Sequence, residues 1–133
     1  MLSLDGALLV ACLNAASLAL IDAGVPMPSI MAAISSGIIA NADDASAKPE
    51  PTLDLNNAEE QELPFLSLAT VAGPPNEEDK VSILMMETRI PIGGPNNRLE
   101  AMLATGIDGC KQVRLRMEEV VRKHGAKVMQ GRK

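Results

Sequence analysis

Residues 5–27, DGALLVACLNAASLALIDAGVPM, decide how this chain folds. Over residues 7–21 only Asn14 and Ser17 are polar, so the segment has no face that favours water. A helix that is apolar on nearly every side is normally buried within a protein. The stretch therefore predicts a core helix over residues 7–21, sandwiched inside a domain.

The ends of this helix are also marked in the sequence. Asp5 can accept hydrogen bonds from the free N–H groups of the first turn, and Gly24 followed by Pro26 stops the helix. A membrane span would need about 20 apolar residues, and this run is shorter, with Asp22 near its end. A signal peptide needs a basic start, whereas the first basic residue is Lys48. A buried core helix is favoured, and we expect no membrane partner.

The composition limits the class of protein. The chain has 133 residues, 47% of them hydrophobic, with a net charge of −5. This length fits one domain or part of one, and the negative charge argues against a free-standing nucleic-acid binder, which usually has a basic patch. The two cysteines, Cys12 and Cys110, fall on predicted core faces of helices. They give no disulfide framework and no metal-ligand spacing, so we predict no metal site and a reducing compartment.

The middle of the chain predicts strands separated by polar loops. The expected strands are residues 29–39, 52–55, 65–72 and 80–88. Residues 41–51 are small and polar and predict a mobile surface loop. In the strand over 80–88 both alternating sets of side chains are largely apolar, which is typical of a central strand covered on both faces.

The last segment predicts a long amphipathic helix. Asn97 can cap it, with Glu100 closing a capping box, and apolar residues then recur at three- and four-residue steps up to Val120. We therefore predict one domain over residues 1–133, of the α/β (α+β) class. A mixed sheet of about four strands would pack with two long helices.

One acidic constellation could carry chemistry. Asp54 follows a short predicted strand, with Glu59 and Glu60 on the turn beyond it. Clustered carboxylates can hold Mg²⁺ or move a proton. Alternatively, Asn57 and Glu60 have capping-box spacing and Glu59 is simply solvated. Both interpretations stay open on physical grounds. His124, the only histidine, is expected to be a solvated or helix-dipole residue.

Several segments resemble the RNase PH family. Residues 5–27 resemble its D-G-G/S…N-A-A-x-x-A-L-x-D-A-G-I-P-M segment. Three later segments are similar to fungal exosome ring subunits of that family: LDLNNAEEQE (53–62), KVSILMMETRIPI (80–92) and RLEAMLATGIDGCKQVRLRMEEVVRKHG (98–125). Residues 42–49 and 93–97 depart from the pattern as loop insertions. The resemblance implies the second half of an RNase PH-like domain, of the ribosomal protein S5 domain 2-like type.

The resemblance also implies a chemistry, that of a phosphate-dependent 3′→5′ exoribonuclease. In active members, arginines hold the attacking inorganic phosphate, and two aspartates six residues apart assist with Mg²⁺ and the leaving oxygen. Asp54 matches the first aspartate, and the second position holds Glu60, which is one methylene longer. Catalytic groups must usually be held to about 0.5 Å. The family's phosphate-binding arginines lie in its amino-terminal half, which this sequence does not include, so we expect vestigial positions and a truncated chain.

The function that we predict is a non-catalytic ring subunit of the RNA exosome, acting in 3′-end processing and degradation of rRNA and mRNA. Its partners would be other RNase PH-like ring subunits, cap proteins and single-stranded RNA, in the nucleus, nucleolus and cytoplasm. Lys111, Arg114 and Arg116 are candidate RNA contacts by charge alone, because RNA channels use basic side chains. No cofactor is expected, with Mg²⁺ and phosphate needed only in an active assembly. The alternatives are an active phosphorolytic exoribonuclease within the assembly and, more weakly, a small α/β ligand-binding or regulatory module.

Overall fold

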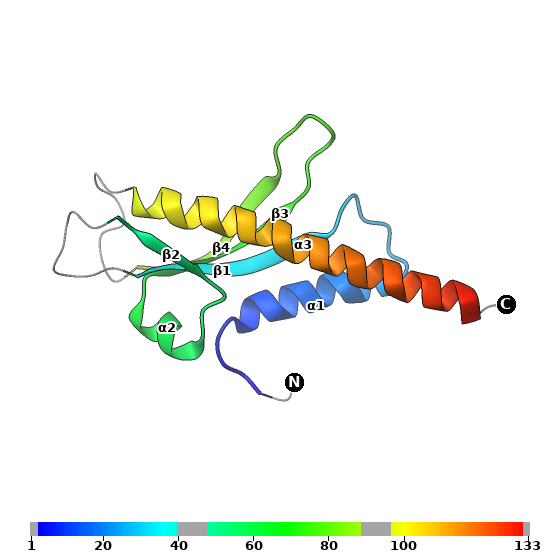
Figure 1. The fold of residues 1–133 in the computed structure, drawn as a ribbon, viewed down its shortest axis with the longest axis horizontal. Helices are drawn as coiled ribbons and strands as arrows, with labels where there is room; N and C mark the ends of the chain where they lie inside the picture. The colour runs from blue at the N-terminus through cyan, green and yellow to red at the C-terminus, as the bar shows by residue number, and fades with distance from the viewer. Residues whose placement is uncertain (1–2, 40–47, 89–96, 132–133) are drawn as a thin grey trace.

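The computed structural model describes residues 3–39, 48–88 and 97–131 (Figure 1). The elements run in the order α1 (Leu8–Asp22), β1 (Met31–Ile39), β2 (Glu50–Leu53), α2 (Asn57–Glu62), β3 (Phe65–Val71), β4 (Lys80–Glu87) and α3 (Arg98–Gly131). The strands form one sheet in the order β2-β1-β3-β4. The predicted helices and strands are therefore all present within this part of the chain.

Every strand pair in the sheet is antiparallel. β1 pairs with β2 and β3, and β3 pairs with β4. The α+β class is confirmed, but the prediction of a mixed sheet was wrong. Parallel neighbours need a crossover connection, usually a helix that packs across the sheet. Within the described residues, the only helix between two strands is α2, whose six residues are too few to make such a crossover.

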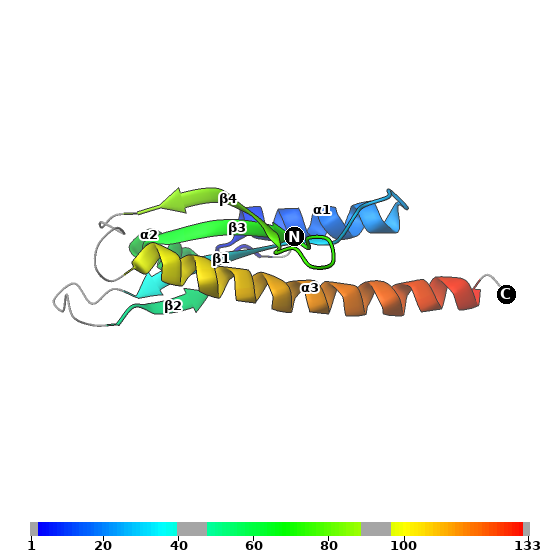
Figure 2. The ribbon, with the colours of Figure 1, turned by 90° about the horizontal axis from the view of Figure 1, so that it is seen from above.

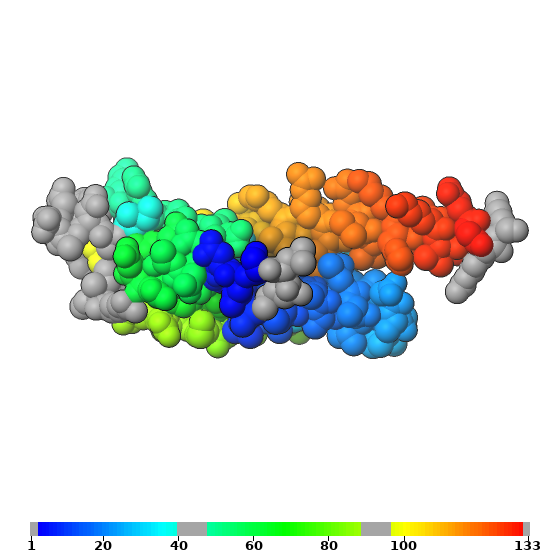
Figure 3. All heavy atoms as spheres, turned by 90° about the horizontal axis from the view of Figure 1, so that it is seen from below, coloured from blue at the N-terminus to red at the C-terminus, as the bar shows by residue number. Residues whose placement is uncertain are grey.

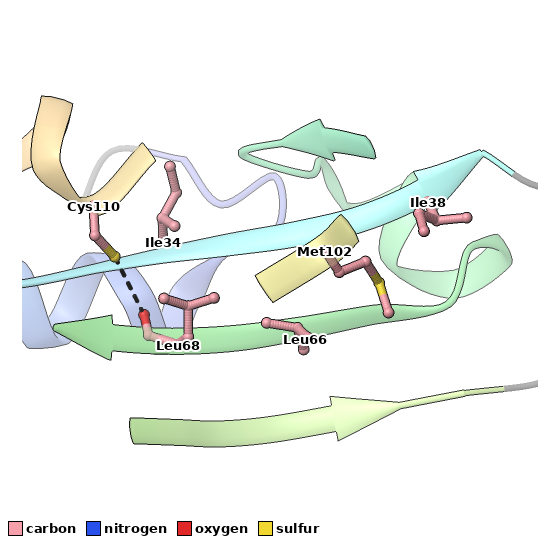
Figure 4. Close-up of a cluster of buried hydrophobic side chains, with 6 residues drawn as sticks. All are labelled: Ile34, Ile38, Leu66, Leu68, Met102 and Cys110. Atoms are coloured by element: carbon pink, nitrogen blue, oxygen red, sulfur yellow. Dashed lines mark hydrogen bonds between the residues drawn. The ribbon is translucent and has the colours of Figure 1, made fainter. Parts of the chain in front are cut away.

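The sheet is the middle of three layers. α3 packs on one face, over β1, β2 and β3, and α1 packs on the other face, over β1 and β3 (Figure 2). The core on the α3 side contains Ile34 and Ile38 of β1, Leu66 and Leu68 of β3, and Met102 and Cys110 of α3 (Figure 4). The smaller core on the α1 side contains Val10, Ala33 and Ala69. β1 and β3 are consequently buried on both faces.

The orientation of α1 differs from the prediction. Only Val10 and Ser17 of this helix are buried, while Leu8, Leu9 and Leu20 are exposed. Its polar residue Asn14 faces the sheet. The Asn14 side chain accepts a hydrogen bond from the Ala33 N–H at 2.8 Å and donates to the Ala33 carbonyl at 3.0 Å.

This contact has a structural reason. β2 pairs with β1 only from Ser36 onward, so the backbone of Ala33 has no strand partner on that side, and buried backbone groups must be satisfied. The Asn14 amide supplies the missing partner. The prediction of a sandwiched helix was wrong for the described residues, in which one side of α1 is uncovered. Cys12 is likewise exposed, whereas Cys110 is buried as predicted.

β4 is the second correction. The apolar pattern over residues 80–88 predicted a central, covered strand, yet β4 is at the edge of the sheet and all of its residues are exposed. A strand with two apolar faces needs cover on both. In the part of the chain that the structure describes, no element supplies that cover.

The loops and the helix ends complete the comparison. Most of the predicted loop 41–51, and residues 93–96 of the second insertion, lie outside the described residues, while Glu50 and Pro51 belong to β2. Asp5 does not cap α1. Ala7 occupies the N-cap with a left-handed φ of 50° and no side-chain cap. Among the described residues, no helix is long and apolar enough to cross a membrane.

Two glycines let α3 approach the sheet closely. A Cβ at Gly106 would be 2.3 Å from Leu68 Cδ2, and one at Gly109 would be 2.8 Å from Leu53 Cδ1. Because Leu68 is fully buried in the core, it has no free space to move into. Glycine weakens a helix, so these positions exchange helix propensity for close packing.

We predict that Gly106→Ala lowers the free energy of unfolding by roughly 1 to 2 kcal/mol, because the cost of overpacking exceeds the gain in helix propensity. Gly125→Ala is the matched control in the same helix, where nothing lies within 4 Å of the new Cβ. It should raise the stability by up to about 1 kcal/mol. Urea unfolding measures both variants, and a stabilised Gly106→Ala would contradict the packing described for α3.

Candidate functional site

The acidic turn between β2 and α2 is the first candidate site. The turn begins at Asp54, whose N–H donates to the Ser35 carbonyl at 3.0 Å. Leu55 is buried, and its N–H donates to Ser35 Oγ at 3.1 Å. The turn is thereby anchored to β1 and holds the Asp54 side chain in solvent.

The backbone at Asp54 is unusual. Its φ is 57°, in the left-handed region that residues with a Cβ rarely adopt. Asp and Asn tolerate this region better than other non-glycine residues, because their short polar side chains bond locally. The backbone of this turn therefore favours an aspartate at position 54 for a reason unrelated to catalysis.

Glu60 has a different role from Asp54. Its Oε1 accepts a hydrogen bond from the N–H of Ala7 at 2.8 Å, just before α1 begins. Reciprocally, Asp5 Oδ1 accepts from the Asn57 N–H at 3.2 Å, at the start of α2. Glu60, which is in α2, thus satisfies a backbone donor at the start of α1, and Asp5, which precedes α1, satisfies one at the start of α2. Negative charge is stabilising at the start of a helix. Glu60 joins α2 to the amino-terminal segment of the chain.

The capping box is one residue earlier than the sequence analysis placed it. Asn56 caps α2 by accepting from the Glu59 N–H at 3.0 Å, and Glu59 Oε2 accepts from the Asn56 N–H at 2.9 Å. The predicted pair was Asn57 and Glu60. Because the capping box is one residue earlier, Glu59 has the capping role and Glu60 is free to bond to Ala7.

This turn has little capacity for catalysis or for metal binding. Among the described residues, neither Asp54 nor Glu60 has a Lys or Arg nitrogen within ion-pair distance. The same residues contain no group of three or more His, Cys, Asp and Glu side chains that could hold a metal. Two carboxylates with added water can still bind Mg²⁺ weakly. However, Glu60 would share its carboxylate with the Ala7 N–H.

The basic candidates on α3 have unequal environments. Lys111 and Arg116 are exposed, and Arg116 pairs with Glu119 at 3.4 Å. Arg114 is buried, with 8% of its surface exposed. Its Nη1 donates to Asp79 Oδ2 at 3.1 Å and its Nη2 donates to Thr70 Oγ1 at 2.6 Å. Arg114 therefore connects α3 to β3 and to the segment before β4, and the three residues form no single basic surface.

The Arg114 contact also changes a titration. The hydrogen bond from Arg114, helped by its positive charge, lowers the pKa of Asp79 although burial opposes this. Nearby Cys110, whose Sγ is 3.9 Å from the Leu68 carbonyl, has a thiol pKa raised by burial (Figure 4). A protonated, buried thiol is a poor nucleophile. Sequence spacing could not find the Asp79–Arg114 pair, because its partners are 35 residues apart.

A groove of about 460 Å³ separates the carboxyl-terminal parts of α1 and α3. Its lining is mainly aliphatic, and His124 Nε2 is 2.9 Å from Asp22 Oδ1 at this groove. α1 lies at the surface beside α3 (Figure 3). His124 is exposed, as expected of a solvated residue, and it also forms a contact between these two helices.

Comparison with known proteins identifies relatives over most of the chain. No family model matches the sequence. The exosome complex component SKI6 of Saccharomyces cerevisiae is 36% identical over 123 residues, which are 92% of this chain and 44% of that protein. The chain is homologous to exosome components of the RRP41/SKI6 type. The human exosome complex component RRP41 is 32% identical over 124 residues, 92% of this chain and 44% of that protein.

A solved structure agrees on the fold. The crystal structure of Rrp46 from rice superposes with a TM-score of 0.57 and 23% sequence identity, covering 90% of this chain and 49% of that one. The resemblance to the RNase PH-like exosome subunits is therefore confirmed. The chain spans about 44% of the length of the yeast relative.

We predict that Asp79→Asn destabilises the protein by about 1–2 kcal/mol at neutral pH, because the buried Arg114 loses a charged hydrogen-bond partner. The pKa of Asp79 is lowered in the folded state, so its stabilising effect is present above the unfolded-state pKa. That effect is lost as pH falls through the folded-state pKa. The difference between wild type and variant should therefore shrink below about pH 4.

Urea unfolding at a series of pH values measures this difference. Glu119→Gln is the control, since Glu119 lies in an exposed pair with Lys123 and exposed pairs contribute little. A gap between wild type and Asp79→Asn that stayed constant from pH 7 to pH 3 would disprove the assigned contact.

We predict that Glu60→Ala lowers the free energy of unfolding by about 0.5–2 kcal/mol, as the loss of a helix-capping acceptor does. Glu60→Gln should lose less, because the amide oxygen can still accept from the Ala7 N–H. Glu62→Ala, at an exposed position of the same helix, is the control. Equal stability of all three variants and wild type would remove the structural role assigned to Glu60.

Proposed function

We propose that this chain acts as a structural, non-catalytic ring subunit of the RNA exosome, in 3′-end processing and degradation of rRNA and mRNA. The observation that carries the proposal is homology to RRP41/SKI6-type exosome components over 92% of the chain. The partners that we propose are other RNase PH-like ring subunits, cap proteins and single-stranded RNA. The proposed locations are the nucleus, the nucleolus and the cytoplasm.

The surface of α1 supports a role within an assembly. Its exposed side carries Leu8, Leu9 and Leu20, with exposed fractions from 41% to 44%. Its polar Asn14 is instead directed at β1. Helices whose outer side faces water normally have the opposite arrangement, with polar residues on that side. An outward apolar side that is this continuous favours contact with further protein.

The acidic turn supports the non-catalytic part of the proposal. Phosphorolysis brings an anionic phosphate to an anionic backbone, and this needs positive charge at the reacting centre. Asp54 and Glu60 have no such partner among the described residues, and Glu60 is engaged with Ala7. The residues at the family's two carboxylate positions are better explained by the backbone of the turn. Mg²⁺ and phosphate would be needed only if the assembled complex were active.

For RNA, we propose backbone contacts by Lys111 and Arg116, which are exposed on α3. Phosphate contacts need basic groups that reach the strand. Arg114, the third basic candidate, is held by Asp79 and Thr70. Its proposed contribution is therefore to position α3, on which the other two residues lie.

Affinity purification of the tagged chain from its own cells, followed by mass spectrometry, tests the ring role. We expect exosome ring and cap proteins to be recovered. Leu9→Glu should reduce the recovery several-fold, because it places a charge on the outward side of α1. Leu115→Glu is the matched control, since Leu115 is a lone leucine that is 65% exposed on α3. Recovery of no exosome protein would refute the role.

The purified assembly also separates the structural role from the active alternative. It is incubated with single-stranded RNA, inorganic phosphate and Mg²⁺, and released nucleoside diphosphates are measured. A non-catalytic subunit predicts equal release from wild-type and Asp54→Asn assemblies. Release that depends on Asp54 would instead establish the phosphorolytic exoribonuclease.

A further inference from the structure

β4 is an open edge strand. It is the last strand of the sheet, and each of its eight residues is exposed. α3 packs over β1, β2 and β3, and α1 over β1 and β3, so neither helix lies over β4 to a comparable extent. Figure 2 shows β4 apart from α3. An edge of this kind presents unpaired backbone N–H and C=O groups to any further strand.

The opposite edge of the sheet is protected. β2 has four residues and contains Pro51, which has no N–H to donate. β4 is twice as long and contains neither proline nor glycine. Natural edge strands are usually shortened or interrupted by proline to prevent pairing. β4 is neither shortened nor interrupted by proline. Charges and bulges also discourage edge pairing, but the charges of β4 are confined to its two ends, and its bulge leaves the other residues paired in order with β3. Its large side chains at Ile83 and Met86 are 48% and 46% exposed.

The sequence of β4, KVSILMME, is complementary to itself when it is reversed. Antiparallel pairing about the middle of β4 would place Lys80 opposite Glu87 of a second strand, Val81 opposite Met86, and Ser82 opposite Met85. The two ends of such a ladder pair opposite charges, and the next pair inward, Val81 with Met86, is apolar. Both kinds of cross-strand pair are favourable.

A β-bulge in β4 makes this register possible. Met85 pairs with Ser67 of β3 and Ile83 pairs with Leu68, so Leu84 is an extra residue in β4. Directly opposed residues have their side chains on the same face of the sheet. A two-fold axis between antiparallel edge strands places the same face of both copies on the same side of the joined sheet. In a regular strand, Lys80 and Glu87 would be on opposite faces and could not be opposed.

With the extra residue in β4, the residues that would be opposed across the axis have their side chains on the same face of the sheet. Val81, Ile83 and Met86 are opposite Thr70, Leu68 and Leu66, whose side chains are on the α3 side. Lys80, Ser82, Met85 and Glu87 are opposite the alternate residues of β3, which include Ala69 on the α1 side. Lys80 and Glu87 therefore share a face, as do Val81 and Met86. In a two-fold pair the extra residue Leu84 of each strand lies beside the axis and takes no part in these pairs, so the residues on both sides of it stay in register.

From these observations we propose that β4 binds β4 of a second copy of this chain. The two copies are related by a two-fold axis at Ile83, which is opposite Ile83 of the second copy, and their sheets join into one continuous antiparallel sheet. The occupant is a second copy because the charges at the two ends of β4 complement each other only when the strand meets itself reversed. The interface is isologous, so it closes as a dimer and leaves only the protected β2 edges. This inference does not depend on the proposed exosome role.

Sedimentation equilibrium of the full 133-residue chain tests the dimer. We expect a monomer–dimer equilibrium in which Ile83→Lys, which brings like charges together at the axis, gives monomer at all concentrations measured. Leu115→Lys is the matched control, since Leu115 is an apolar residue that is 65% exposed on α3. Circular dichroism confirms that each variant is folded. A wild-type monomer, or a dimer abolished by Leu115→Lys and unaffected by Ile83→Lys, would overturn the proposal.

A charge exchange tests the register. Lys80→Glu and Glu87→Lys should each raise the dissociation constant roughly tenfold, because each variant places like charges at both ends of the interface. The double variant Lys80→Glu/Glu87→Lys should restore the wild-type value. These end residues are exposed, so loss of folding does not confuse the result. A double variant weaker than either single variant would exclude this register.

Discussion

The need to cover β1 and β3 on both faces is the constraint on which this fold depends. Ala32, Ala33, Leu66 and Leu68 have at most 1% of their surface exposed, so neither strand tolerates a solvated face. α3 meets this need on one side with a close approach allowed by Gly106 and Gly109. α1 meets it on the other side with small contacts at Ala33 and Ala69. The remaining elements attach to this three-layer centre.

The sequence pattern predicted which segments fold, but not which sides of them are covered. The α3 periodicity and the apolar strands at β1 and β3 gave these elements correctly, since their pattern and their burial agree. α1 and β4 have apolar residues on all sides, and periodicity cannot orient an element without a polar face. Asn14 and the buried Ser17 were the orienting signals in α1. They were missed because a polar residue on an apolar helix is expected to point outward, and Asn14 points at β1.

The candidate site shows the same limit. The sequence identified the acidic turn, and the structure contains it, with its cap one residue earlier at Asn56. Contacts between distant segments were not predictable from spacing. Glu60 binds Ala7 across 53 residues, and Arg114 binds Thr70 across 44. The sequence could not distinguish an exposed basic residue of α3 from a buried one such as Arg114, because the partners of Arg114 lie in β3 and in the segment before β4.

The left-handed backbone at Asp54 has a consequence for how related sequences are interpreted. Glycine, asparagine and aspartate are the residues that tolerate a φ of 57°. An aspartate could therefore persist here through descent because it shapes the turn, long after any nuclease chemistry had disappeared. Retention of this one carboxylate across homologues is poor evidence for an active enzyme. Only the residues around it, with no backbone preference of their own, carry that information.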